Sequence, residues 1–156
     1  MGRSNVRLDY GELQKLKEQI EKVADATQMD QFLTSCAKEL AARLLGKVIR
    51  RTPVGQYPSG SGKTGGTLRR GWTGANGNAN GYANSLNVNK VGTDYVIEII
   101  NPVEYASYVE FGHRTRNHTG WVEGHFMLTI SEDEIRKSAP RILEKKLEKY
   151  LKECFK

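Results

Sequence analysis

Apolar residues recur at three- and four-residue steps in two stretches of the first third of the chain, which is the spacing of an amphipathic helix. The first stretch covers about residues 10 to 25 and follows Asp9 and Glu12, whose spacing is that of a capping box. After a break near Thr27 to Asp30, a longer run continues up to Pro53, which disfavours helix in the residue before it. The pattern predicts an N-terminal pair of helices, of which the second has the broader apolar face.

The C-terminal part of the chain has the same helical period. Ser131 and Glu134 have a second capping-box spacing, and apolar residues then keep the period to the end of the chain. Pro140 lies inside this run and lacks the amide hydrogen that a helix needs at that place. We therefore expect a C-terminal helix with a kink, or with a restart just after Ser138.

Strand-like alternation replaces the helical period in the middle of the chain. Residues 82 to 91 alternate weakly and are predicted to form an exposed strand, and residues 95 to 100 alternate more strongly. Gly92-Thr93-Asp94 supplies a turn between them, so the two segments are predicted to form an antiparallel hairpin. A first short strand is expected at residues 67 to 72.

The segment after the hairpin, residues 103 to 109, is predicted to be a short helix that carries Tyr105 and Tyr108 to the sheet edge. Residues 110 to 112 then turn into another strand or loop. Together the elements indicate an α+β fold, in which an antiparallel sheet of three to four strands packs against an N-terminal helical pair and a C-terminal helix. The whole chain, residues 1 to 156, fits one domain.

Residues 53 to 81 interrupt the periodic pattern with glycine, asparagine, serine and proline. Compact domains rarely contain a structureless connection of this length. We interpret the segment as a flexible glycine-rich insertion that is either mobile or ordered only against a partner.

Composition narrows the class of protein. Hydrophobic residues make up 38% of the chain and charged residues 27%, close to the globular norm. No apolar stretch is long enough for a membrane helix, and the first residues lack the apolar core of a secretory signal. We therefore expect no membrane partner and a protein that stays in the cytoplasm in which it is made.

The net charge of +6 makes weak attraction to DNA or to an acidic partner plausible. Positive residues are spread along the chain, and in the last predicted helix they alternate with glutamates, which is typical of a solvated face. No motif of a nucleic-acid reader is present. Cys36 and Cys154 fall on the apolar stripes of two predicted helices, where we expect free thiols that pack as small hydrophobes.

One glycine-rich stretch looks at first like a phosphate-binding loop. Ser59 to Thr64 contains the sequence Gly-Lys-Thr, but the full pattern needs a glycine where Tyr57 stands. Such a loop also follows a buried strand and opens a helix, whereas this stretch follows a predicted helix and Pro53. The stretch is better explained as a flexible link, and no cofactor is expected.

A histidine-containing loop allows an alternative function, a small metal-dependent nuclease that uses His113, Asn117 and His118. His125 and Glu123 lie nearby in the sequence. The spacing does not match a ββα-metal finger, because no Asp-His pair precedes the asparagine. Three histidines in one loop are more typical of a polar surface loop, so we expect no metal site and no enzyme activity.

Aromatic and arginine residues are the types that protein interfaces concentrate. Core and sheet packing are favoured for Tyr108 and Phe111, whereas Trp72 and Trp121 are better interface candidates. The candidate interface residues are Arg69, Arg70, Trp72, Tyr105, Tyr108, Glu110, Phe111 and Trp121.

Three short motifs occur in a fixed order along the chain. They are Thr52-Pro53-Val54, Gly66-Thr67-Leu68-Arg69-Arg70, and Tyr105-Ala106 with Tyr108-Val109-Glu110-Phe111-Gly112. With the helical flanks and Phe126 ahead of the last helix, this order resembles the tail-completion, or neck, proteins of long-tailed bacteriophages and related phage-tail-like particles. Two departures stand out: the family's compact turn after the proline is opened into an insertion, and His113 replaces the common threonine or serine.

The resemblance implies a structural assembly protein in the tail neck of the virion, made in the bacterial host cytoplasm. Such a protein forms a ring at the head-proximal end of the tail, completes the tail and joins it to the head. The implied partners are further copies of the chain in a ring that we expect to be six-fold, the tail terminator or tail tube protein, and the head connector protein. Non-specific contact with DNA in the tail lumen is also expected from the basic residues.

Ring subunits need head-to-tail contacts between two different surfaces. An exposed sheet edge and an extended glycine-rich arm would suit the addition of a strand to a neighbour's sheet. We therefore expect residues 55 to 81 to become ordered on assembly, with Arg69, Arg70 and Trp72 in contact with a neighbouring subunit or the tail tube.

Overall fold

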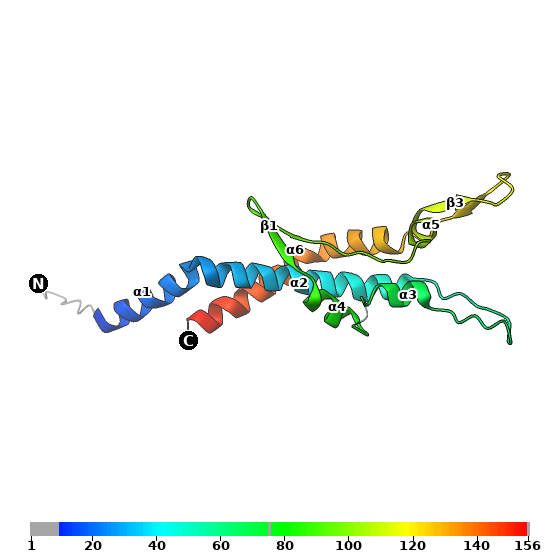
Figure 1. Cartoon of the computed structure of the whole chain (residues 1–156). Helices are drawn as coiled ribbons and strands as arrows, with labels where there is room; N and C mark the ends of the chain where they lie inside the picture. The colour runs from blue at the N-terminus through cyan, green and yellow to red at the C-terminus, as the bar shows by residue number, and fades with distance from the viewer. Residues whose placement is uncertain (1–9, 75, 156) are drawn as a thin grey trace, which may run out of the picture.

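Two long antiparallel helices form the body of the molecule in the computed structural model, which describes residues 10–74 and 76–155 (Figure 1). They are α2 (Ala26–Arg51) and α6 (Met127–Cys154), and α1 (Tyr10–Ala24) precedes them. The rings of Phe32 in α2 and Tyr150 in α6 stack with their centroids 4.5 Å apart. The N-terminal helical pair and the C-terminal helix predicted from the sequence are therefore confirmed. None of the helices in the described part of the chain combines the length and apolar character needed to cross a bilayer.

The break between α1 and α2 lies at Asp25, earlier than the position near Thr27 to Asp30 that the pattern predicted. The Asp25 carboxylate accepts hydrogen bonds from the N–H groups of Thr27 and Gln28 at 2.8 and 3.1 Å, which caps α2. This local cap was not recognised in the sequence, and it shifts the boundary. The predicted capping box of Asp9 and Glu12 lies outside the residues and side chains that the structure describes. The predicted end of α2 before Pro53 is confirmed.

Two short helices, α3 (Thr67–Gly71) and α4 (Ala79–Ser85), complete the core against α2. The expected strand at residues 67 to 72 is therefore wrong, and so is the strand expected for the first half of residues 82 to 91. Both segments are too short to show a period, and their apolar residues pack against α2 as helices. The buried core cluster consists of Ala41, Leu45, Val48, Leu68, Trp72, Tyr82, Ala83 and Met127.

The remaining elements are two antiparallel hairpins and a short helix. The predicted hairpin is confirmed as β1 (Val88–Val91) and β2 (Asp94–Ile97), with Val88 opposite Ile97. The side chains of Lys90 and Tyr95 bind the Asp30 carboxylate, which attaches this hairpin to α2. The second hairpin, β3 (Gly112–Arg114) and β4 (Trp121–Glu123), follows α5 (Ala106–Phe111).

The α+β class is confirmed, with the four described strands divided between two separate two-stranded sheets. The short helix predicted at residues 103 to 109 is present but shifted as α5, which includes residues 110 and 111, and the chain turns from it directly into β3. Cys36 is buried and Cys154 half-buried, and both thiols are free, as expected.

The C-terminal helix begins at Met127, four residues before the predicted capping box. Ser131 is fully buried inside α6, and its hydroxyl donates to the carbonyl oxygen of Met127 at 2.6 Å, so Ser131 does not cap the helix. The helix continues through Pro140, so the restart after Ser138 does not occur. Hydrogen bonds from the Ser138 hydroxyl to the carbonyls of Glu134 and Ile135 lie one turn before the proline.

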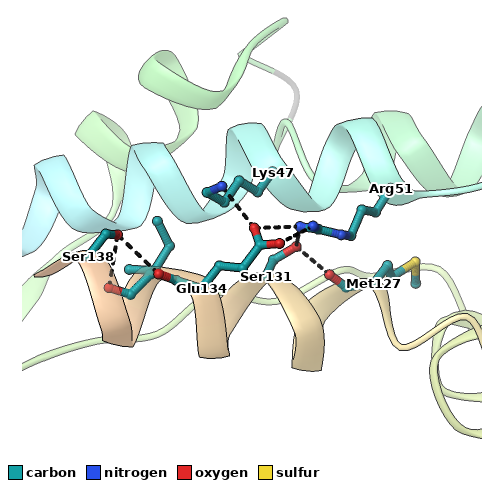
Figure 2. A network of polar contacts seen from close by, with 7 residues as sticks. Lys47, Arg51, Met127, Ser131, Glu134 and Ser138 are labelled. Atoms are coloured by element: carbon teal, nitrogen blue, oxygen red, sulfur yellow. Dashed lines mark hydrogen bonds and ion pairs between the residues drawn. The ribbon is translucent and has the colours of Figure 1, made fainter.

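A charged cluster joins α2 to α6 one turn after this buried serine (Figure 2). The Glu134 carboxylate accepts hydrogen bonds from Lys47 at 2.8 Å and from the guanidinium of Arg51. Arg51 also donates to the Ser131 hydroxyl at 3.1 Å. The hydrogen bond from Arg51, followed by that from Lys47, lowers the pKa of Glu134 from 4.5 to about 2.

This shift predicts an acid-sensitive contribution to stability. Because the pKa of Glu134 is lower in the folded chain than in the unfolded chain, the ionised carboxylate stabilises the fold above about pH 4.5, and this contribution is lost as the pH falls towards 2. We expect the urea midpoint of the wild type to fall more between pH 5 and pH 2.5 than that of Glu134→Gln. Equal falls in the two proteins would show that the cluster does not contribute.

Candidate interaction surface

The end of the molecule that carries α5 and the second hairpin exposes a group of aromatic side chains. Their rings are unusually open for this residue type: Phe111 is 61% exposed, Tyr108 58% and Trp121 55%. Phe126 lies beside Phe111 with the ring centroids 6.5 Å apart in an edge-on arrangement. We call this group the aromatic surface, and it consists of Tyr105, Tyr108, Phe111, Trp121 and Phe126.

The expectation that Tyr108 and Phe111 pack in the core is therefore wrong. Both side chains lie on α5, a helix of six residues whose only buried side chain is that of Glu110. The apolar pattern of such a short helix does not show which of its faces the rest of the protein covers, because that depends on where α6 begins. Trp121, by contrast, is exposed as its position in a polar loop suggested.

Glu110 is buried beneath the aromatic surface and connects α5 to α6. Its side chain is 5% exposed, and its carboxylate accepts hydrogen bonds from the N–H groups of Leu128 and Thr129 at 2.9 and 2.8 Å, and from the Thr129 hydroxyl at 2.6 Å. These N–H groups belong to the first turn of α6, where no preceding carbonyl can accept from them. The glutamate thus caps α6 from a distant part of the sequence, and its negative charge faces the positive end of the helix.

The backbone around Glu110 strengthens the same junction. The carbonyl of Glu110 accepts from the N–H of Phe126 at 3.0 Å, and the carbonyl of Val109 accepts from His125 at 2.8 Å. Phe126 has φ of 46°, a left-handed conformation that aromatic residues rarely adopt. The junction therefore fixes the direction of an exposed phenylalanine at some conformational cost.

Gly112 is required where the chain turns from α5 into β3. Its φ is 84°, and a Cβ atom there would lie 2.4 Å from the carbonyl oxygen of Val122. Gly124, directly after β4, would likewise place a Cβ 2.3 Å from the carbonyl oxygen of Glu110. The chain at the end of β4 approaches the turn from α5 into β3 so closely that neither position accommodates a Cβ atom, which gives a physical reason for the glycine in the Glu-Phe-Gly motif.

The glycine-rich segment has two structural parts. Residues 67 to 71 and 79 to 85 are the helices α3 and α4, so only residues 53 to 66 form an extended arm. Figure 1 shows this arm and the β3–β4 hairpin projecting at the same end of the molecule. A pocket of about 230 Å³ between the base of the arm and α5 is lined by Val54, Tyr57, Tyr105 and Val109, among others.

The other candidate interface residues lie close to the arm but have different roles. Trp72 is 4% exposed and belongs to the core, so it is not available to a partner. Arg69 donates twice to the carbonyl oxygen of Thr52, at 2.7 and 3.2 Å, and so ties α3 to the end of α2. Arg70 is exposed and donates to the carbonyl oxygen of Gly65 at 3.2 Å, which leaves it accessible beside the arm.

The histidine-containing loop shows no arrangement for catalysis. The ring of His113 contacts Tyr108, with the centroids 5.7 Å apart, and the Asn117 side chain accepts from the Thr115 hydroxyl at 2.6 Å. Within residues 10–74 and 76–155, no group of three or more His, Cys, Asp or Glu side chains converges as metal ligands would. The nuclease alternative therefore finds no support in the positions of His113, Asn117 and His118.

Comparison with known protein families finds a match. The model of the HK97 gp10-like family, described as "Bacteriophage HK97-gp10, putative tail-component", matches residues 14–112. This range covers well over half of the chain and contains α2, the core helices and the whole of α5. No curated protein and no solved structure matches the chain significantly. The chain belongs to the HK97 gp10-like family of bacteriophage tail components.

Proposed function

We propose that this tail component forms a ring at the head-proximal end of the phage tail, completes the tail and joins it to the head connector. Its partners in this proposal are further copies of itself, in a ring of six, the tail terminator or tail tube protein, and the head connector protein. The role is structural, and the working parts are surfaces that fit their neighbours. Membership of a tail-component family supports a place in the virion.

The observation that carries the proposal is the aromatic surface. Monomeric proteins seldom expose several large aromatic rings together, and such groups mark interaction sites. The rings stand on a junction that Glu110 and Gly112 make rigid, so little conformational entropy is lost when a partner covers them.

The arm supplies a second surface of a different kind. Head-to-tail contacts in a ring need two unlike surfaces on each subunit. The arm extends from the end of α2 (Figure 1), and, among residues 55 to 64, the two sides are joined only at the tip, where the Ser61 N–H donates to the carbonyl oxygen of Pro58 at 3.1 Å. Its unpaired backbone groups are available to the sheet edge of a neighbour. The proposed arm consists of residues 53 to 66, since α3 and α4 belong to the core.

A tail-joining assay tests both surfaces. Purified heads and tails that lack this protein would be mixed with each variant, and joined particles counted by electron microscopy. We expect Phe111→Ser combined with Trp121→Ser to reduce joining by at least about tenfold, because each lost aromatic contact costs about 1–2 kcal/mol or more. Deletion of residues 56 to 64 should have a similar effect.

The deletion is a clean test because it leaves the core intact. A Cβ atom on Gly65 would lie 2.0 Å from the carbonyl oxygen of Gly55, so the two ends of the deleted segment are already in contact. The thermal midpoint of each variant, measured alone, should remain close to that of the wild type. If both variants joined heads to tails normally and formed the same oligomer by light scattering, the proposal would be wrong.

A further inference from the structure

A groove with a volume of about 1260 Å³ lies between α2 and α6, with α4 as its third wall. It lies away from the aromatic surface and shares no residue with it. We call it the basic groove. Four of its cationic side chains come from α2: Lys38, Arg43, Lys47 and Arg50. Four more come from α6: Arg141, Lys145, Lys146 and Lys149.

The basic groove carries the net charge of the whole protein. Its walls contain eight cations and a single carboxylate, Glu39, which leaves an excess of seven positive charges. The complete chain has a net charge of +6. The rest of the chain is therefore close to neutral, and the positive charge is a property of this one groove.

The side chains of half of these cations form neither an ion pair nor a hydrogen bond within the part of the chain that the structure describes. Lys47 binds Glu134 at 2.8 Å, Arg43 and Lys146 bind Glu39 at 3.0 and 2.7 Å, and Lys38 donates to the carbonyl oxygen of Asn84 at 2.9 Å. The four others have no ion pair with any carboxylate of the described residues: Arg50, Arg141, Lys145 and Lys149. Four like charges held along one groove repel one another, and an anionic partner would relieve that repulsion.

Gly46, which lines the groove, leaves room for a partner to approach the α2 backbone closely. Gly46 lies inside α2, five residues before its last residue, where glycine is less stable than alanine. A Cβ atom there would meet only the Arg50 guanidinium, at 3.8 Å, so packing within the described residues does not require a glycine. The groove is also lined by small and aliphatic side chains: Ala42, Ala79, Ile135 and Ile142.

We infer that the basic groove is the docking site for an acidic amphipathic helix of another protein. An apolar face of small side chains would lie on the floor at Gly46, and acidic side chains on both flanks would pair with the cations of α2 and α6. This inference is independent of the proposed role in joining head and tail.

Two other occupants fit the groove less well. DNA phosphates are reached by long cationic side chains and do not require a glycine in the floor, and no aromatic side chain lines the groove for base stacking. A second copy of the chain lacks the complementary charge. Each of its three long helices has at least as many cations as carboxylates in its sequence.

Binding titrations with two probes test the inference. The first probe is a synthetic helical peptide of about 20 residues, with an alanine and leucine face flanked by glutamates. The second is a short DNA duplex of random sequence. Fluorescence anisotropy at low salt would be measured for the full chain. We expect the peptide to bind more tightly than the duplex.

Three variants distinguish the contribution of the groove's charge to peptide binding from the contribution of its shape. Lys145→Glu with Lys149→Glu should weaken peptide binding by at least about tenfold. Gly46→Gln should weaken it similarly, because the new side chain fills the floor, although its thermal midpoint should equal or exceed that of the wild type. Lys22→Glu with Lys63→Glu changes the net charge equally outside the groove and should leave binding unchanged.

Two results would overturn the inference. One is a peptide that does not bind the wild type. The other is a duplex that binds more tightly than the peptide, with a loss in the Lys145→Glu and Lys149→Glu protein and no change in Gly46→Gln. That second pattern would identify the groove as a site for nucleic acid, which was the DNA contact expected from the basic residues.

Discussion

Replacement of Trp72 by alanine is expected to lower the free energy of unfolding by about 3–5 kcal/mol, the usual effect of removing a buried tryptophan side chain. Trp72 is 4% exposed and packs in the core cluster that joins α2, α3, α4 and Met127 of α6. The cavity left by the indole ring would lie where these elements meet. Urea unfolding of the isolated protein, followed by circular dichroism, measures the effect without any partner.

Trp72→Phe is the matched control for this prediction. The Trp72 Nε1 atom is buried and finds no hydrogen-bond partner among the described residues, so its removal leaves no acceptor unpaired. We expect the phenylalanine variant to lose less than about 2 kcal/mol, since most of the ring volume is kept. An alanine variant as stable as the wild type, but defective in tail joining, would instead place Trp72 at an interface.

Replacement of Glu110 by alanine is expected to destabilise the protein by about 2–4 kcal/mol, because a buried acceptor of three hydrogen bonds is lost and the first turn of α6 is left without its cap. The loss should appear in the isolated chain as a lower urea midpoint. It should be accompanied by faster hydrogen exchange at the N–H groups of Leu128 and Thr129.

Thr129→Val tests whether the cap itself causes the effect. This change removes the hydroxyl contact to Glu110 at 2.6 Å but keeps both backbone N–H bonds to the carboxylate. We expect a loss of about 1 kcal/mol, clearly smaller than in Glu110→Ala. If Glu110→Ala and Thr129→Val were equally stable, the carboxylate would not act as a cap. Glu110 would then be a candidate for contact with a partner protein.

The candidate interface residues divide according to what surrounds them in space. Glu110 and Trp72 are buried and support the structure, whereas Tyr108 and Phe111, for which core packing was favoured, are exposed. In the sequence all four are residues in short segments next to glycine. Whether such a side chain is covered depends on a helix that begins far away in the chain, and neither period nor composition of the segment contains that information.

The distribution of charge also could not be predicted from the sequence alone. The cations of α2 and α6 are far apart in sequence, and on α6 they alternate with glutamates, which predicted a solvated face. Antiparallel packing of the two helices places four cations from each along one groove, while most of the carboxylates lie elsewhere. The sequence shows only the order of charges along the chain, whereas the electrostatic field depends on the distances between them in space.

Local sequence patterns were enough to predict the long helices, the end of α2 before Pro53, the hairpin at Gly92, the α+β class and the phage-tail family resemblance. Each of these depends on interactions between near neighbours or on a contiguous motif. Tertiary structure alone decided that residues 67 to 71 are helical and that Glu110 caps α6. It also decided that the aromatic rings of α5 face outward and that the positive charge gathers in one groove. Short segments make too few local contacts to fix their own conformation, so packing against distant parts of the chain selects it.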